Sequence, residues 1–487
     1  MDQASDRAPE RAYDPPHGTA LGQRLAAPAG VPADRSGFVL LDSGEDAWAA
    51  RLALVRTAQQ SIDAQYYIWN EDETGRLLAA EMLGAAERGV RIRVLLDDFN
   101  VGAKASALAA LDSHPQISVR LYNPAAPTAR RGVPWALGLV ADHERLNRRM
   151  HNKSLTVDGA ATVLGGRNIG DEYFDRHPTF VFRDLEVLGV GSVAAEVADA
   201  FDLYWNSAWA YPVGAALRSA PSADELRQVF DGLRSLATAR DQKSDAELAA
   251  LATAIHWAPH RLVYDQPLSS EVTSAPETPQ AVAVALAARS AQARREILIE
   301  SAYLVIGEEG RQLIGSLTAG GVQMNALTNS LASNDVLPNH AAYARVRKNM
   351  LLSGLQIHEL RPDAAACGEL IANDGCRAGR LLSVHSKAAV IDRETLFVGS
   401  FNLNQRSIYL NTEIGLLIDS PVLAGQVAEG IIALLRPENS WSLELDRQGR
   451  LRWLAADGVV VSHDPQTSAW RRAKVWLLSL LPAVEYF

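Results

Sequence analysis

A short motif that combines a histidine, a lysine and an aspartate occurs twice in this chain with the same internal spacing. The first copy, HNKSLTVD, begins at His151, and the second copy, HSKAAVID, begins at His385. A glycine and an asparagine follow each copy in the same register, in the segments 165–168 and 399–402. Chemically demanding positions that recur at one constant offset indicate an internal duplication.

These residue types suit a reaction at an electrophilic centre. A neutral imidazole can attack such a centre, a protonated one can give its proton to a leaving group, and an ammonium stabilises developing negative charge. The short apolar run after each lysine predicts a buried strand. Because residues two apart on a strand face the same side, His151 and Lys153 should point into one space, as should His385 and Lys387.

The two motif aspartates, Asp158 and Asp392, complete the motif and by that membership are candidate catalytic residues. However, they lie well past the histidines, and Asp158-Gly159 is also a hairpin-turn signal. Geometry therefore gives both aspartates a structural role, in which they hold the turn and the backbone without touching substrate.

One such motif alone would more often be an ordinary surface strand. Two copies change that balance, because a core would have to bury two histidines and two lysines with no gain in packing. We therefore interpret the pair of motifs as a site.

The paired motif, with a Gly/Ser-x-Asn turn after each copy, resembles the phospholipase D superfamily over nearly the whole chain beyond the N-terminal tail. Residues 145–153 and 165–174 are similar to bacterial cardiolipin synthases, in particular to the C-type branch of those enzymes. The segment 327–335 points the same way. The resemblance implies two duplicated α/β sandwich domains around a pseudo-twofold axis, with both histidines facing one phosphate.

The same resemblance implies a phosphohistidine intermediate. One histidine attacks phosphorus while the other exchanges a proton with the departing and incoming alcohols; the symmetric motif allows either assignment, and we expect His151 to attack. A carboxylate should orient each histidine. Glu413 fits in the second half, whereas Asp184 and Glu186 are both open in the first, with Glu186 as the working assignment.

Other groups should donate to the phosphoryl oxygens, where charge builds during the reaction. The expected donors are the two motif lysines and three turn residues, Asn168, Ser400 and Asn402. With these donors present, neither a metal ion nor another cofactor is expected.

Similarity to cardiolipin synthases implies transfer of a phosphatidyl group to the glycerol hydroxyl of phosphatidylglycerol. The donor could be a second phosphatidylglycerol or phosphatidylethanolamine. Attack by water, as in a phospholipase D, is the alternative. A nuclease is less expected, because the formal net charge is −10 and nucleic acids favour basic surfaces.

The expected partners are therefore phospholipids and a membrane surface, with no nucleic acid, and any protein partner is left open. Of the adjacent Tyr66 and Tyr67, we expect one to lie in the core and the other to line a lipid or headgroup pocket.

The order of helical and strand patterns predicts an α/β fold in two domains. The chain has 487 residues, 48% of them hydrophobic, which is enough for two cores. Alternating strand and helix patterns begin at Gly37 and repeat after a linker. We expect a disordered tail at 1–36, a first domain at 37–215, a helical insertion and linker at 216–280, a second domain at 281–465 and an amphipathic segment at 466–487.

The last of these segments carries Trp470 and Trp476, three cations and a leucine-rich run. This pattern suits a helix in a membrane interface, although a helix packed on its own domain would look much the same. No apolar run approaches the roughly 20 residues that a membrane-spanning helix needs. We expect a cytoplasmic protein bound peripherally to the inner membrane. Cys367 and Cys376 are expected to be reduced, with a bridge between them, nine positions apart, as the alternative.

Overall fold

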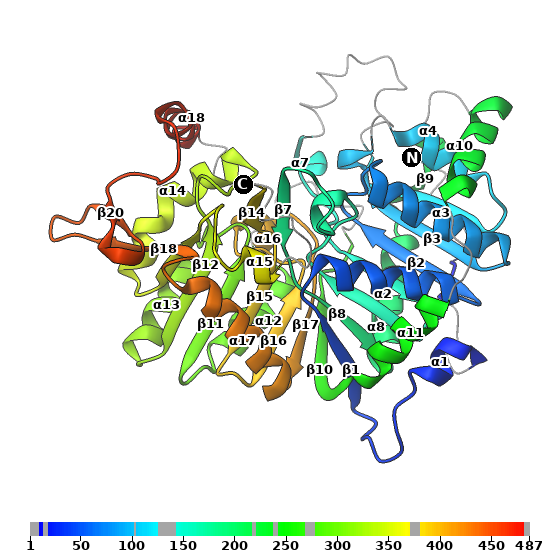
Figure 1. Cartoon of the computed structure of the whole chain (residues 1–487), viewed down its shortest axis with the longest axis horizontal. Coiled ribbons are helices and arrows are strands. Elements are labelled where there is room, and N and C mark those ends of the chain that lie inside the picture. The colour runs from blue at the N-terminus through cyan, green and yellow to red at the C-terminus, as the bar shows by residue number, and fades with distance from the viewer. Residues whose placement is uncertain are drawn as a thin grey trace.

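The computed structural model describes residues 9–12, 18–101, 104–124, 143–216, 221–236, 242–267, 278–370 and 380–481. Two α/β halves lie side by side, the first at the right of Figure 1 and the second at the left. Each half is built around a mixed β-sheet, and the two sheets share a strand along one edge. The duplication expected from the paired motifs is therefore present as two halves of the same architecture.

The sheet of the first half has the order β9-β4-β3-β2-β5-β6-β8-β1. Neighbours among β2, β3 and β4 are parallel, and all other neighbours in this order are antiparallel. The strands are β1 (Arg35–Leu41), β2 (Ser61–Tyr66), β3 (Arg91–Asp97), β4 (Ile117–Tyr122), β5 (Ser154–Val157), β6 (Ala161–Gly165), β8 (Glu186–Val190) and β9 (Ala210–Pro212).

The sheet of the second half repeats this order as β10-β17-β16-β15-β11-β12-β13-β18, extended by β19 and β20. Here β11, β12 and β13 are the parallel strands. The strands are β10 (His256–Tyr264), β11 (Glu296–Ser301), β12 (Gln323–Asn329), β13 (Gln356–Leu360), β15 (Lys387–Ile391), β16 (Thr395–Gly399), β17 (Ile414–Asp419), β18 (Ser440–Leu445), β19 (Leu451–Leu454) and β20 (Val460–Val461).

Strand β10 joins the two sheets. Its first part pairs with β1, where Ala258 lies opposite Ser36, and its last part pairs with β17, where Leu262 lies opposite Leu416. This strand falls within the segment 216–280, which was expected to be a helical insertion and linker. The second sheet thus starts before the expected boundary at 281, because a strand rich in His, Pro and Arg lacks a clear apolar alternation.

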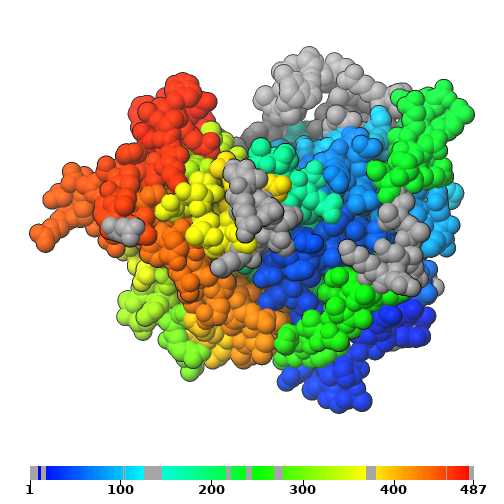
Figure 2. All heavy atoms as spheres, in the orientation of Figure 1, coloured from blue at the N-terminus to red at the C-terminus, as the bar shows by residue number. Residues whose placement is uncertain are grey.

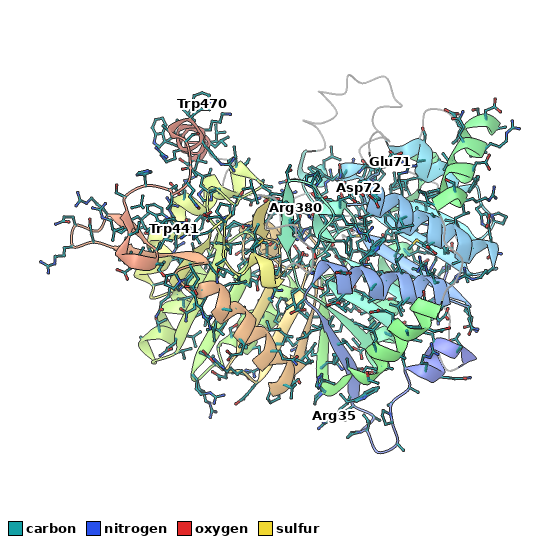
Figure 3. The ribbon with its side chains drawn as sticks, in the orientation of Figure 1. Arg35, Glu71, Asp72, Arg380, Trp441 and Trp470 are labelled. Carbon is teal, nitrogen blue, oxygen red and sulfur yellow. The ribbon has the colours of Figure 1, made fainter. Side chains whose placement is uncertain are left out.

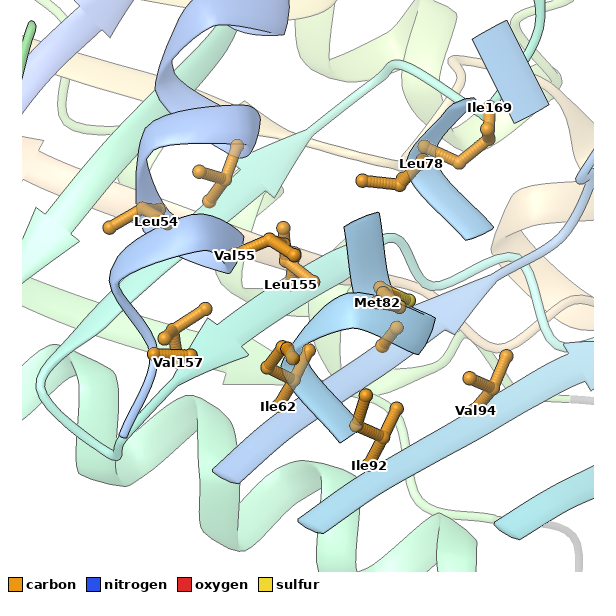
Figure 4. Packing of buried hydrophobic residues seen from close by; sticks show 14 of the residues in the cluster. Leu54, Val55, Ile62, Leu78, Met82, Ile92, Val94, Leu155, Val157 and Ile169 are labelled. Carbon is orange, nitrogen blue, oxygen red and sulfur yellow. The ribbon is translucent and has the colours of Figure 1, made fainter. Parts of the chain in front are cut away.

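Helices cover the sheets (Figure 1). Figure 4 shows Val55 of α2 and Met82 of α3 packed over Ile62, Ile92 and Leu155 of the first sheet. The longer helices are α2 (Gly44–Thr57), α3 (Glu73–Glu87), α4 (Ala105–Asp112), α8 (Ser192–Trp205), α10 (Ala223–Leu236), α11 (Gln242–Thr253), α12 (Ala281–Ser290), α13 (Glu308–Ala319), α14 (Leu337–Leu352), α17 (Pro421–Leu435) and α18 (Ala469–Ser479). The short ones are α1 (Ala20–Arg24), α7 (His143–Leu146), α9 (Val213–Ala216), α15 (Cys367–Leu370) and α16 (Gln405–Tyr409).

Polar capping residues mark the start of two helices of the first half, α2 and α3. Ser43 precedes α2 and its hydroxyl accepts from the backbone N–H of Asp46, while Asp72 precedes α3 and accepts from Gly75. Such caps satisfy backbone donors that have no partner inside the helix.

One hydrophobic cluster spans both halves. It contains Val193 and Val197 of α8 together with Val427 and Ile431 of α17, and it includes strand residues from both sheets. A second link is the two-stranded parallel sheet of β7 (Phe180–Arg183) and β14 (Leu381–Val384), one strand from each half. The two halves therefore pack as one body.

Part of the N-terminal segment is packed against the first half. Leu21 and Leu25, on and just after α1, are buried, and Glu10 pairs with Arg120 at 2.6 Å. The expected disordered tail is thus wrong for residues 9–12 and 18–36, whereas 1–8 and 13–17 lie outside the described residues.

Helix α18 near the C-terminus packs on the second half through one face. Its Val475 is buried, and Arg471 donates to the carbonyls of Leu331 (3.0 Å) and Asn334 (2.8 Å). The other face is open to solvent: Trp470 and Trp476 are 66% and 62% exposed. The helix stands at the upper edge of the molecule (Figure 2), with Trp470 at its outer side (Figure 3).

Two further observations bear on the expected compartment. Cys367 is disulfide-bonded, contrary to the expectation of reduced thiols, and Cys376 lies outside the described residues. Within the described part of the chain, no helix combines the length and apolar character needed to cross a membrane.

Candidate active site

Each motif histidine lies just before a β-hairpin, β5–β6 in the first half and β15–β16 in the second. The backbone N–H of His151 donates to the carbonyl of Thr412 (2.9 Å), and that of His385 donates to the carbonyl of Arg183 (2.7 Å). Each motif is therefore held by the backbone of the opposite half, and this exchange brings both motifs to the junction between the halves.

The carboxylates that contact the histidines are exchanged in the same way. His151 Nδ1 lies 2.8 Å from Glu413 Oε2, and His385 Nδ1 lies 2.7 Å from Asp184 Oδ2. Both carboxylates are fully buried. Because the contact uses Nδ1, the other ring nitrogen of each histidine, Nε2, is directed away from the carboxylate. A carboxylate on Nδ1 also favours the tautomer that carries its proton there and leaves Nε2 with a lone pair.

The strand register explains why Asp184 contacts a histidine and Glu186 does not. Glu186 lies opposite the glycine that ends β6, and Gly415 lies opposite the glycine that ends β16. Glu186 thus corresponds to Gly415, and Asp184 corresponds to Glu413. Glu186 instead accepts from the guanidinium of Arg51 at 2.6 Å in the buried core. The working assignment of Glu186 as a histidine-orienting residue is wrong, although the pair of candidates included the right one.

Asp184 can reach the junction because the chain changes sheets there. It leaves β7 at Arg183 and enters β8 at Glu186, so Asp184 and Leu185 lie between the two strands. The residues around Asp184 are apolar or charged and give no turn signal in the sequence. The interruption between β7 and β8 therefore becomes visible only when the pairing of β7 with β14 is known.

The two motif lysines are buried beside the histidines. Lys153 is 0% exposed and Lys387 is 1% exposed. Lys153 Nζ donates to the carbonyl of His151 (2.6 Å), and Lys387 Nζ donates to the carbonyl of His385. Two buried ammonium groups in one place are costly unless negative charge is close. The site is therefore suited to an anionic ligand.

Burial and the neighbouring cations keep both histidines neutral. Burial, opposed by the charge of Glu413 and assisted by Lys153 and Lys387, lowers the pKa of His151 to about 4. Burial and Lys387 likewise lower the pKa of His385 to about 3. Each histidine responds to the lysines of both halves, so all four groups share one electrostatic environment.

The same environment lowers the pKa of the lysines. Burial lowers the pKa of Lys153 to about 7, with Lys387 adding repulsion and Glu413 opposing both. Burial lowers the pKa of Lys387 to about 8. The paired carboxylates stay ionised: burial acts against them, but their contacts with the histidines and lysines hold the pKa of Asp184 and Glu413 below the usual values.

The two turn asparagines have different surroundings. Asn168 accepts from the backbone N–H of Ile68 (3.1 Å) and donates to the hydroxyl of Tyr173 (2.9 Å). Asn402 is 3% exposed, and its Oδ1 has no hydrogen-bond partner among the described residues. The side-chain oxygen of Asn402 can therefore still accept a hydrogen bond, whereas that of Asn168 already accepts one.

Ser400 contacts the carboxylate that holds His151. Its hydroxyl donates to Glu413 Oε2 and accepts from the backbone N–H of Ile414 (3.0 Å). Its proton thus points to Glu413, and phosphate binding by Ser400 stays a prediction. Glu413 also accepts from Ser407 (2.6 Å), so two hydroxyls fix this carboxylate.

The motif aspartates have the structural role expected from geometry. Asp158 accepts from the backbone N–H groups of Gln59, Gln60 and Ser61, and Asp392 accepts from those of residues 294–296. Both aspartates have positive φ, 54° and 55°, at the hairpin turn. Each carboxylate thus fastens its motif hairpin to the start of the neighbouring strand.

Aromatic rings pack against both histidines, and two of them, Tyr173 and Phe182, were not predicted from the sequence. Tyr67 packs edge-on against His151 with ring centres 5.1 Å apart, and Tyr173 and Phe182 pack on His385 at 5.0 and 4.8 Å. Tyr66 is fully buried in the core, so the adjacent tyrosines divide between core and site as expected. For Tyr173 and Phe182 the sequence carried no periodic signal.

The arrangement suits phosphoryl chemistry. Within the described residues, no group of three His, Cys, Asp or Glu side chains is placed to hold a metal ion. Two imidazoles with fixed tautomers and two ammonium groups converge instead, and such a set can bind a phosphodiester, attack it and exchange protons.

Comparison with known proteins gives the same class. A family model described as "Cardiolipin synthase, PLD-like domain" matches residues 52–205 and 286–434, one segment in each half. A solved structure, that of phosphatidylserine synthase from Haemophilus influenzae, superposes with a TM-score of 0.58 over 96% of this chain and 98% of that chain. Its sequence identity is 13%, so it supports the fold alone.

Curated relatives narrow the class. The chain is 38% identical over 459 residues to cardiolipin synthase C of Escherichia coli, which covers 92% of this chain and 95% of that protein. It is 25% identical over 383 residues to a cardiolipin synthase of Staphylococcus aureus, covering 78% of this chain and 63% of that protein. The chain belongs to the cardiolipin synthase family with phospholipase D-like domains.

Proposed function

We propose that this protein is a cardiolipin synthase, which transfers a phosphatidyl group to phosphatidylglycerol through a phosphohistidine intermediate. The observation that carries the proposal is the exchanged pairing of His151 with Glu413 and of His385 with Asp184 across one junction. The name of the Escherichia coli relative supplies the substrate class.

In the first step, Nε2 of His151 attacks the phosphorus of the donor lipid. A bond from Nε2 to phosphorus forms, the bond from phosphorus to the headgroup oxygen breaks, and His385 gives its proton to the departing alcohol. In the second step, His385 removes the proton from a hydroxyl of phosphatidylglycerol, whose oxygen attacks phosphorus and releases His151. The proton returns to His385, so the cycle closes.

The assignment of His151 as nucleophile draws support from how firmly its carboxylate is held. Glu413 accepts from Ser400 and Ser407 as well as contacting His151. A carboxylate fixed in this way keeps the proton on Nδ1 and stabilises the cationic ring that forms when Nε2 is phosphorylated.

The lysines bind the phosphate and set its charge. An entering phosphodiester brings negative charge next to Lys153 and Lys387, which favours their protonated forms and that of His385. The low resting pKa of His385 then rises in the complex, where its proton is needed. Asn402 contributes to phosphate binding through its Nδ2–H groups, because phosphoryl oxygens accept hydrogen bonds and its Oδ1 cannot donate one.

Helix α18 is the proposed contact with the membrane. Its solvent-facing side carries Trp470, Trp476 and Leu477, which are 66%, 62% and 53% exposed, and Arg472 and Lys474 share the helix. Exposed tryptophans beside cations suit the interface of an anionic bilayer. The helix is fastened to Leu331 and Asn334, next to Asp335, whose carboxylate interacts electrostatically with Lys387 at the junction between the halves. A membrane at this helix would therefore lie close to the junction.

A triple variant, Trp470→Ser, Trp476→Ser and Leu477→Ser, tests this contact. It should lose sedimentation with phosphatidylglycerol vesicles and keep activity on detergent-dispersed lipid. Val422→Ser, at an exposed apolar position on α17, is the matched control. Unchanged vesicle binding by the triple variant would refute the membrane role of α18.

Mass spectrometry of lipid products tests the function. Purified protein is incubated with vesicles of headgroup-labelled phosphatidylglycerol, with and without phosphatidylethanolamine, beside His151→Ala. We expect cardiolipin that depends on His151, together with labelled glycerol if phosphatidylglycerol is the donor or ethanolamine if phosphatidylethanolamine is. Phosphatidic acid alone would make the protein a hydrolase, and no lipid product would reject the proposal.

A further inference from the structure

A cavity of about 370 Å³ opens in the first half between the sheet and helices α3, α4 and α10. Its floor includes Ile92, Val94 and Leu96, alternate residues of β3 that face the same side and span roughly 13 Å of strand. Apolar side chains from the three helices form its walls, among them Met82, Leu111 and Leu233. Its volume falls in the range of small-molecule pockets.

One end of this cavity reaches the candidate active site. Tyr67 and Asp97 line it there. Tyr67 is the residue whose ring packs against His151, and Asp97 accepts from the backbone N–H of Met150 (2.9 Å), directly before His151. The cavity therefore ends at two residues that lie directly beside the first histidine.

The corresponding space in the second half is packed with side chains. Helix α4 has 8 residues, whereas α14, at the equivalent place after the second parallel strand, has 16. Tyr343 and Met350 of α14 are buried in one cluster with Met324 of β12 and Leu317 of α13. The difference indicates that the cavity is a feature of the first half and not of the repeated fold.

Helix α10 completes the outer wall of the cavity. It lies beside α3 and α4 in Figure 1 and contributes Val229, Gly232 and Leu233 to the lining. This helix belongs to the segment between the two halves, outside the duplicated pattern. The segment is thus more than a linker, because it encloses apolar space next to His151.

We propose that this cavity holds one acyl chain of the phosphatidyl group while that group is carried on His151. The inference rests on the proposed function and adds the binding site for the transferred lipid. The occupant follows from chemistry: the cavity is apolar along β3, and its end at Tyr67 and Asp97 lies beside His151, which matches the polarity of a phosphatidyl group. The second half has its own apolar cavity, of about 560 Å³, but it lies between the sheet and helices α12, α13 and α16. That cavity is lined by none of three residues that contact His385, namely Tyr173, Phe182 and Asp184.

Dependence of rate on acyl length is the first test. With donor lipids of one headgroup, kcat/KM should rise by roughly fourfold per methylene added and then level off when the cavity is full. The substrates are dibutanoyl to didecanoyl phosphatidylglycerol, each below its critical micelle concentration, so that the acyl chain is transferred from water. A rate that does not depend on chain length would overturn the proposal.

Variants that fill the cavity are the second test. Ala79→Leu adds a branched chain to the lining, and Gly232→Leu does so from a position where a Cβ would meet no atom within 4 Å. Each should lower the ratio of kcat/KM for long-chain to short-chain lipid at least tenfold. Ser235→Leu, exposed on the same helix and outside the lining, should leave the ratio unchanged. Equal losses on both lipids would overturn the proposal.

Photo-crosslinking provides a readout that needs no turnover. The probe is phosphatidylglycerol with a diazirine at the end of one acyl chain, and the labelled peptides are mapped by mass spectrometry. Crosslinks in α3, α4 or α10 that Gly232→Leu abolishes would support the acyl site, even if no cardiolipin formed and the proposed activity failed. Crosslinks confined to other elements would overturn it.

Discussion

The two halves of this protein share a sheet order, a motif, and a motif aspartate that fastens the hairpin to the neighbouring strand. They differ in what surrounds the motif. Asp158 and Asp392 bind three consecutive backbone N–H groups in the same way. By contrast, Ser400 holds the carboxylate at His151, whereas its counterpart at His385 is Gly166. The first half also has an apolar cavity bounded by the short helix α4, whereas at the equivalent place in the second half the side chains of the longer α14 fill the space.

The parts that are duplicated, the motif hairpin and the carboxylate that contacts Nδ1, are those that both histidines need. A histidine must be held by its hairpin and its carboxylate whichever role it has in the reaction. The nucleophile and the proton carrier, however, need different neighbours, and a transferred lipid needs room on one side only. Differences between the halves therefore mark roles, and the experiments below are arranged by how strongly they probe those differences.

Loss of either histidine should have the largest effect. Because both act on one phosphate, His151→Ala and His385→Ala should each lower kcat by about 10⁴-fold or more, as loss of a nucleophile or of a general acid does. Cardiolipin formation in a timed assay measures this. If the halves were two independent sites, each single variant would keep about half of the activity, which would contradict a shared site.

Replacing Asp184 and Glu186 one at a time should show that these two buried carboxylates have different roles. Asp184→Asn should lower kcat by about a hundredfold with little change in melting temperature, because His385 loses the group that orients it. Glu186→Gln should instead destabilise the fold by roughly 3 kcal/mol, because it leaves Arg51 buried without its ion pair. Thermal melts and kinetics on both variants check this. The reverse pattern would restore Glu186 as the orienting residue.

Making the halves more alike should have a moderate cost. Ser400→Gly copies the first half and removes a hydroxyl that donates to the ionised Glu413. A hydrogen bond to a charged group is worth about 1.5 kcal/mol, so kcat should fall roughly tenfold. Ser400→Thr keeps a hydroxyl and serves as the control. No loss in Ser400→Gly would mean that Ser400 does not help to hold Glu413 in place.

The affinity of the site for a phosphodiester anion, such as diethyl phosphate, should depend on pH through the pKa difference between the lysines. Calorimetric titration at several pH values measures this affinity. The affinity should fall above about 7, where Lys153 loses its charge before Lys387 does at about 8. Lys153→Arg keeps the charge and should move this fall to higher pH. An unchanged fall in this variant would exclude Lys153 as its cause.

Replacement of the two motif aspartates should affect activity least. Asp158→Asn and Asp392→Asn each replace an ionised acceptor of three backbone N–H groups, so each should lower the melting temperature by a few degrees. At a temperature where both variants are folded, kcat should stay within about twofold of the unchanged protein. A loss of kcat comparable to that of the histidine variants would make these aspartates participants in the reaction.

The sequence predicted what depends on local pattern. The repeat of HxKxxxxD gave both histidines, both lysines and the duplicated fold, and the turn signal at Asp158-Gly159 gave the structural role of the aspartates. Strands β5 and β15 follow from short apolar runs. All of these features are encoded within a few neighbouring residues.

The sequence did not decide features that depend on pairing between the halves. The choice of Asp184 over Glu186 follows from register across β6 and β8, and the exchange of carboxylates follows from how the halves meet. The contact of Ser400 with Glu413 was not predicted, because Glu413 is distant along the chain. Strand β10 was missed because its polar residues hide the alternation, and the cavity depends on the length of α4 relative to α14.

Trapping of the covalent intermediate tests the central claim, that two matching histidines at one site have different roles. The enzyme is mixed with phosphatidylglycerol, quenched in base within milliseconds to preserve phosphohistidine, digested and analysed by mass spectrometry. We expect a phosphatidyl adduct on the peptide that contains His151, and none when His151→Ala is used. An adduct on His385 alone would reverse the roles, and no adduct on either peptide would contradict the mechanism.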